Sequence, residues 1–240
     1  LPITPMGMKT NELVLVRGVD ATKATLRRWN ADPWPVLRAW VGWSVLTAVA
    51  LLVAVLVVAR ASQPDATPLA LPGVNMGVRP GDILHTLTRN ALVLALHAMA
   101  CVAGFIAGSS VPQQAAARTG LSRKVHERAG SLAIAFVVCA TVFSLSTQAY
   151  VLGHAASTLS AQFHMSPALL LVGLLPHALP ELTALFLPLA AWVIASRRQQ
   201  WEELLAATVV TVAIAVPVLI ASAFVELYLS PRLIVALAGG

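Results

Sequence analysis

The sequence predicts an all-helical, polytopic transmembrane bundle with five membrane-spanning helices. Hydrophobic residues make up 58% of the 240 residues and charged residues only 11%, whereas a soluble domain carries about 25% charged residues. Five apolar segments are long enough to cross a bilayer, which takes about 20 residues of helix. Apart from two glutamates, the acidic and basic residues lie at the ends of these segments or between them. A soluble globular domain is therefore excluded.

The chain is expected to have three parts. A cytoplasmic or interfacial N-terminal segment covers residues 1–38, the transmembrane domain residues 39–232, and a short tail residues 233–240. The expected spans are at about residues 40–59, 91–111, 131–151, 167–195 and 204–229. The stretch between the first two spans, residues 60–89, is rich in proline and glycine, which predicts an irregular loop.

The positions of the basic residues predict how the spans are oriented. Lys and Arg accumulate in the cytoplasmic segments of membrane proteins. With five spans, twelve of the sixteen basic residues lie on the side of the N-terminus and four on the other side. We therefore expect a cytoplasmic N-terminus and a C-terminus outside. A hairpin in place of the fourth span would change the ratio to eleven to five, so five spans are favoured.

The N-terminal segment contains a basic stretch with helical character, ATKATLRRW at residues 21–29. Lys23, Arg27 and Arg28 are suited to bind anionic lipid headgroups from an interfacial helix. An ordinary basic segment flanking the first span explains the same residues. On composition alone we favour this second interpretation.

The fourth predicted span contains the motif LLPHALPEL at residues 174–182. Pro176 and Pro180 have no backbone N–H and leave two carbonyls without their intrahelical partners, so we expect a kink at these prolines. His177 and Glu181 are four residues apart and therefore face the same side of a continuous helix. The motif thus predicts a polar site inside the longest apolar stretch of the chain.

Polar side chains inside the predicted spans are the candidate functional residues, because such residues are costly in hydrocarbon. They are His97 in the second span, His177 and Glu181 in the fourth, Glu226 in the fifth, and Asn90 at the outer start of the second span. The favoured hypothesis is a buried hydrogen-bonded lock in which His177 and Glu181 pair with Glu226 or His97. An ion or proton path and a metal centre are the alternatives. We expect no metal, because two ligands four residues apart are common by chance and the metalloprotease motif H-E-x-x-H is absent.

The second predicted span contains a G-x-x-x-G pattern formed by Gly104 and Gly108. Two glycines four residues apart allow the backbones of two helices to approach closely. We expect this close packing within the subunit rather than across a dimer.

Sequence signatures of common enzymes and of nucleic-acid binding are absent from the chain. It has no G-x-S-x-G, Walker or G-x-G-x-x-G motif. Cys101 and Cys139 both fall in apolar segments, where cysteine usually serves as a small packing residue. No basic stretch carries interleaved aromatic residues, so nucleic acid is not an expected partner. We expect a protein without catalytic residues or cofactors.

The segment LLPHALPELTALFLPLAAWVIA, with the long apolar helix ending AFVELYLSP, resembles the stage II sporulation protein M family. Members share a proline–histidine–small-residue stretch, a following glutamate–leucine pair and a late glutamate. The corresponding residues are Pro176, His177, Glu181, Leu182 and Glu226. The earlier segment RNALVLALHAMACVAGFIAG is similar to the family's asparagine-initiated helix with spaced glycines, so the resemblance covers roughly residues 82–232.

The resemblance implies a multi-pass protein of the bacterial plasma (inner) membrane that is not itself an enzyme. The sporulation member of the family serves a peptidoglycan-degrading partner pair as anchor or scaffold. A scaffold or assembly subunit in cell-envelope remodelling is therefore expected, with membrane lipids and other membrane or envelope proteins as partners. The family's membrane domain is also loosely similar to permeases of some ABC exporters. The alternative is accordingly a transporter subunit that moves an ion, lipid or small solute.

Overall fold

The computed structural model describes residues 14–110 and 120–239, and the regular elements in these ranges are helices. They are α1 (Val14–Ala31), α2 (Trp34–Ala61), α3 (Pro80–Phe105), η2 (Ile106–Ser110), α5 (Gly120–Gln162), α6 (Pro167–Arg198), η3 (Trp201–Glu203), α7 (Leu204–Phe224), η4 (Val225–Leu229) and α8 (Ser230–Ala238). Residues 1–13, 111–119 and 240 lie outside the described residues. The beginning of the predicted N-terminal segment, the end of the predicted second span and the last residue of the tail fall on them.

The prediction of an all-helical protein with five spans is confirmed. Five helical stretches in the described ranges are long and apolar enough to cross a membrane. They are Trp34–Ala61, Pro80–Gly108, Ile134–Gln162, Pro167–Arg198 and Trp201–Ala238. The last of these combines η3, α7, η4 and α8.

The observed helices extend beyond the predicted spans, because a helix ends at backbone signals rather than where its apolar residues end. Trp34 follows Pro33, and Pro80 occupies the first turn of α3, a position that proline favours. The second span, helix α3, therefore begins well before residue 91. The irregular loop covers only residues 62–79. Helix α5 likewise continues past residue 151 to Gln162.

Helix α6 begins and ends at local capping signals. The Ser166 side chain accepts a hydrogen bond from the backbone N–H of Leu169 at 3.2 Å, and Pro167 occupies the first turn. At the other end, Gln199 adopts the left-handed conformation, with φ of 57°. Between these caps the helix continues through three prolines, Pro176, Pro180 and Pro188.

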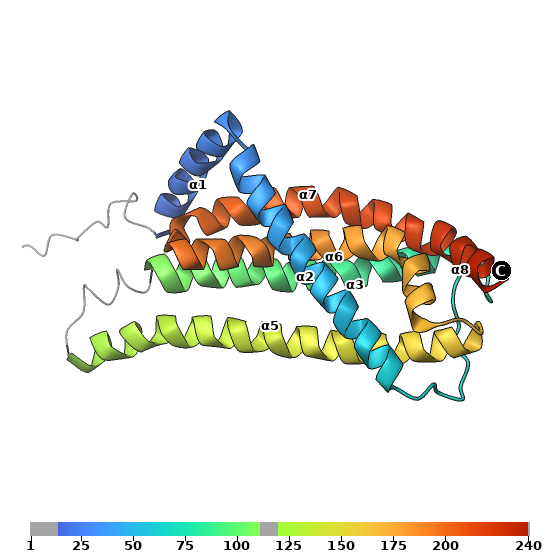
Figure 1. The fold of residues 1–240 in the computed structure, drawn as a ribbon. Coiled ribbons are helices and arrows are strands. Elements are labelled where there is room, and N and C mark those ends of the chain that lie inside the picture. The colour runs from blue at the N-terminus through green and yellow to red at the C-terminus, as the bar shows by residue number, and fades with distance from the viewer. Residues whose placement is uncertain (1–13, 111–119, 240) are drawn as a thin grey trace, which may run out of the picture.

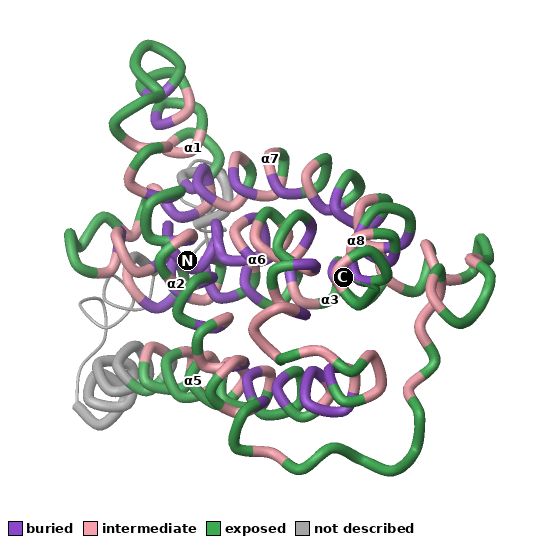
Figure 2. Tube along the Cα trace, turned by 45° about the vertical axis from the view of Figure 1, so that its right-hand side comes forward, coloured by how far each residue is buried: buried purple, intermediate pink, exposed green. Residues whose placement is uncertain are grey.

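Helix α6 is the centre of the bundle. Helices α2, α3, α7 and α8 pack around it, and α1 lies across one end of the bundle (Figure 1). Every residue from Ala184 to Trp192 is buried, so this part of α6 is covered on all sides. In the most apolar 18 residues of each span, 61% are buried in α6 but only 11% in the third span, Ile134–Gln162 of α5. Figure 2 shows the same contrast, because α5 is largely exposed.

The bundle has two ends, which we call the loop end and the α1 end. The loop end carries residues 62–79 and 163–166, and the α1 end carries α1 and residues 199–203 (Figure 1). At the loop end, Gln162 of α5 donates to the backbone carbonyl of Leu69 at 3.2 Å and accepts from its N–H at 3.1 Å. These bonds attach the irregular loop to α5.

Gly73 attaches the same loop to the last span. Its φ is +82°, a value that favours glycine, and a Cβ atom at this position would lie 2.6 Å from the carbonyl oxygen of Leu227. The loop thus extends from α5 across the loop end to η4, where Glu226 is located.

The two glycines of the G-x-x-x-G pattern lie against tryptophan rings of the same chain. A Cβ atom at Gly104 would be 2.6 Å from Nε1 of Trp192, and one at Gly108 would be 2.2 Å from the ring of Trp201. In this chain the pattern therefore brings α3 and η2 close to α6 and η3.

Replacing Gly104 with alanine is expected to destabilise the bundle. Overpacking against buried Trp192 costs about 1–3 kcal/mol, which exceeds the helix-propensity gain of about 1 kcal/mol. Gly42 in α2 is the matched control, because a Cβ atom there would meet nothing within 4 Å. Thermal unfolding in detergent should show a lower midpoint for Gly104→Ala and an equal or higher one for Gly42→Ala. Equal midpoints for the two variants would contradict the close packing.

Candidate functional site

Three helices bring the predicted polar residues into the membrane-spanning part of the bundle, toward its loop end. Asn90 comes from α3, Glu181 from α6 and Glu226 from η4. Asn90 lies ten residues after the start of α3 at Pro80, which places it about 15 Å from the helix end at 1.5 Å per residue. Only 6% of its surface is exposed.

Arg89, Asn90, Glu181 and Glu226 form what we call the polar cluster. Glu181 interacts electrostatically with Glu226 and Arg89, and its side chain approaches Asn90. Glu226 interacts with Arg89, and also with Thr86 and His85 one turn earlier on α3. Arg89 is therefore the arginine that both carboxylates face. Arg89 is exposed on α3, and among the described residues it forms no ion pair with either glutamate. It acts on both carboxyl groups at longer range.

Hydrogen bonding in the polar cluster is incomplete. Nδ2 of Asn90 and Oε2 of Glu181 are buried and have no hydrogen-bond partner of standard geometry. One is a donor on α3 and the other an acceptor on α6, and the two side chains lie close to each other. An unmatched buried donor or acceptor costs about 1–3 kcal/mol. The cluster is therefore less completely hydrogen-bonded than the contacts of His97 and His177.

Glu226 lies in a turn of π-helix, Val225–Leu229. The wider turn has a local cause, because Pro231 has no N–H with which to bond the carbonyl of Leu227. This is also the carbonyl that Gly73 of the loop approaches. Single π-helical turns occur frequently at functional sites.

His177 joins α6 to α8 rather than to another ionisable residue. Its Nδ1 lies 2.6 Å from the hydroxyl oxygen of Ser230, and both residues are buried. The pairing of His177 with Glu226 or His97, which the lock hypothesis expects, is absent from the described hydrogen bonds. Sequence reasoning missed Ser230, because a serine next to a proline indicates a helix start and does not reveal which distant side chain it will meet.

His97 lies deeper in the bundle and joins α3 to α6. Its Nδ1 is 2.8 Å from the backbone oxygen of Leu185, and because a carbonyl can only accept, Nδ1 carries the proton. One turn further, the thiol of Cys101 donates to the backbone oxygen of Pro188 at 3.1 Å. Two side chains of α3 thus bind backbone carbonyls of α6 at Leu185 and Pro188. Sequence reasoning did not single out Pro188.

The structure therefore divides the predicted site residues into separate groups. Asn90, Glu181 and Glu226 are together in the polar cluster. His177 lies one turn from Glu181 on α6 but bonds to Ser230. His97 is apart from them. Pro176 and Pro180 are exposed on the surface of α6. Among the described residues, no group of three or more His, Cys, Asp or Glu side chains is arranged to hold a metal ion.

Comparison with known protein families gives one match. The family model described as Stage II sporulation protein M matches residues 128–231, which confirms the predicted resemblance over this range. The range contains α6, with the LLPHALPEL motif, and Glu226. The earlier segment with Asn90 and Gly104 lies before the matched residues. No curated protein and no solved structure matches the chain.

The bond between His177 and Ser230 is expected to stabilise the contact between α6 and α8. Removing either partner alone, as in His177→Leu or Ser230→Ala, should cost about 1–2 kcal/mol because the other group stays buried and unpaired. The double variant should cost about 1 kcal/mol less than the sum of the two. Unfolding of all three variants in one detergent measures this coupling. Thr47→Ala, which removes a hydroxyl bonded only to its own helix, is the control. Strictly additive costs would contradict the bond.

Arg89 is expected to contribute more to stability than another arginine near the loop end. Arg89→Gln removes the cation that acts on both carboxyl groups, and because Arg89 is exposed we expect it to lower stability by up to about 1 kcal/mol. Adding Glu226→Gln should restore part of this loss by removing one of the charges. Arg232→Gln, at an exposed position of α8, is the control in the same unfolding assay. If Arg89→Gln and Arg232→Gln behave alike, Arg89 does not support the cluster.

Proposed function

We propose, from the match to the stage II sporulation protein M family, that this protein is a non-catalytic scaffold in the bacterial inner membrane. It would hold other envelope proteins in place during remodelling of the cell envelope, with peptidoglycan as the material that those partners act on. The chain's own part in this function is to present a stable membrane surface.

The observation that carries the proposal is an aromatic stripe on α5. Phe136, Phe143 and Tyr150 are spaced seven residues apart, so they lie along one face of the helix. Their exposed fractions are 72%, 74% and 63%. Helix α5 packs mainly against α2, and the described residues leave this stripe uncovered. Large aromatic side chains at regular spacing are suited to packing against a helix of another protein.

The centre of the bundle supports the same proposal. Helix α6 is buried along its middle and joined to its neighbours by the bonds of His97, Cys101 and His177. Such a centre resists rearrangement, because closely packed interiors have few alternative arrangements. A rigid centre with an uncovered helix at its side suits a protein that positions partners.

A transporter subunit is the second candidate, and the polar cluster is the observation that favours it. Carboxylates and an arginine within membrane spans commonly mark ion pathways. A pathway also needs a passage that reaches these groups. The groove of about 210 Å³ between α3 and α5 is lined by His97 but not by Glu181 or Glu226. This groove is therefore not itself a passage to the two glutamates.

A photo-reactive amino acid at position 143 is expected to capture a second envelope protein in native membranes. The reason is that Phe143 lies in the uncovered aromatic stripe. Val53 of α2, with 55% of its surface exposed, is the matched membrane-facing control and should give little product. Identification of both sets of products by mass spectrometry is the measurement. Equal labelling from both positions would remove the support for a scaffold, and capture of an ATP-binding subunit would favour the transporter.

A further inference from the structure

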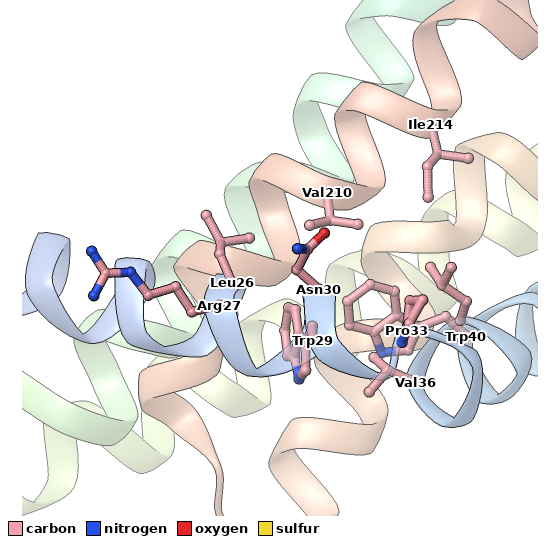
Figure 3. A pocket seen from close by; sticks show the side chains of 10 residues that line it. Leu26, Arg27, Trp29, Asn30, Pro33, Val36, Trp40, Val210 and Ile214 are labelled. Atoms are coloured by element: carbon pink, nitrogen blue, oxygen red, sulfur yellow. The ribbon is translucent and has the colours of Figure 1, made fainter.

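A groove opens at the α1 end of the bundle, between α1, α2 and α7 (Figure 3). Its volume is about 490 Å³, within the range of pockets that bind small molecules. Its lining includes Leu26, Arg27, Asn30, Trp40, Val210 and Ile214. The groove lies far from the polar cluster, at the opposite end of the bundle.

One part of the groove is polar and the rest is apolar. Arg27 and Asn30 project from the exposed side of α1, whereas Val210 and Ile214 of α7 are partly buried. These two residues lie six and ten positions after Leu204, about 9 Å and 15 Å along the helix axis. In Figure 3, Arg27 and Ile214 lie at opposite ends of the groove, and Asn30 points toward Val210. The groove thus has a polar end and an apolar end, as an amphiphilic ligand has.

The base of the groove is a rigid pair of tryptophans. The rings of Trp29 and Trp40 meet edge to face, with centroids 5.1 Å apart and an angle of 86°. Both residues are buried, against Leu187, Ala191, Ala206 and Ala207 of α6 and α7. Helix α1 is also held in place by the ion pair of Arg28 with Glu203. The groove is therefore a built feature of the bundle.

Aromatic and basic residues place the groove at a membrane surface. Trp34 beside it is 75% exposed, and exposed tryptophans gather where a bilayer meets water. Lys23 and Arg38 are exposed nearby on α1 and α2. Among the described residues, Arg27 forms no ion pair with a carboxylate, so its charge is available to an anion.

We propose that this groove binds one phospholipid with an anionic headgroup. The phosphate would accept hydrogen bonds from Arg27 and Asn30, and one acyl chain would lie along Trp40, Val210 and Ile214. Charge complementarity selects the anionic headgroup, and the apolar length along α7 selects an acyl chain over a free phosphate. The lipid would stabilise the docking of α1 on the bundle, whether or not the protein acts as a scaffold.

Native mass spectrometry of the full chain, with phosphatidylglycerol or phosphatidylcholine added in detergent, tests the proposal. The wild-type chain should retain one phosphatidylglycerol at concentrations where phosphatidylcholine is lost. Arg27→Gln should weaken phosphatidylglycerol binding about tenfold, as expected for a lost charge-assisted hydrogen bond. Lys23→Gln removes the same charge one turn away, outside the groove, and should change binding less than twofold. Equal losses in these two variants, or equal retention of the two lipids, would overturn the proposal.

A second pair of variants tests the apolar part of the groove without changing charge. Val210→Trp fills the groove and should weaken phosphatidylglycerol binding, whereas Val209→Trp, at an exposed neighbouring position, should leave it unchanged. Equal binding by both would assign the lipid to surface electrostatics and overturn the proposal.

Discussion

The need to satisfy backbone groups in a membrane interior shapes the centre of this protein. Water is scarce there, so a carbonyl without a partner must be compensated by the protein itself. Helix α6 removes three backbone donors with Pro176, Pro180 and Pro188. The part around Pro188 lies in the buried middle of the helix, where the protein must supply the compensation. Pro188 deprives the carbonyl of Ala184 of its donor. His97 and Cys101 of α3 bind the nearby carbonyls of Leu185 and Pro188, and these bonds tie two spans together.

Burial of α6 on all sides follows from the same constraint. A helix whose backbone depends on its neighbours has to be surrounded by them, and α2, α3, α7 and α8 fill that role. The close approach of Trp192 to Gly104 shows how little space separates α3 from α6. The outer helices can then be less constrained. Helix α5 illustrates this, because its aromatic stripe remains exposed along one face.

The polar cluster and the bundle centre have different characters. The bond of His177 with Ser230 and the bonds of α3 to α6 are short and buried, and they hold helices together. In the cluster, two carboxylates share Arg89, and a donor and an acceptor remain unmatched. The loop that reaches η4 through Gly73 lies at the same end of the bundle. The closely bonded centre supports the proposed scaffold, whereas the incompletely bonded cluster is the feature that favours the alternative of a transporter subunit.

The sequence by itself determined the class of protein, its five spans and the most informative motif. Apolar length is a local property, so the spans were predictable, and the resemblance carried by LLPHALPEL is confirmed over residues 128–231. Helix ends such as Trp34 and Gln162 were predicted less well, because apolar counts do not detect capping and proline signals. The partners of the polar residues were decided only by the tertiary structure. His177 meets Ser230 and His97 meets the backbone of Leu185, since which helices lie side by side depends on packing between residues far apart in the chain.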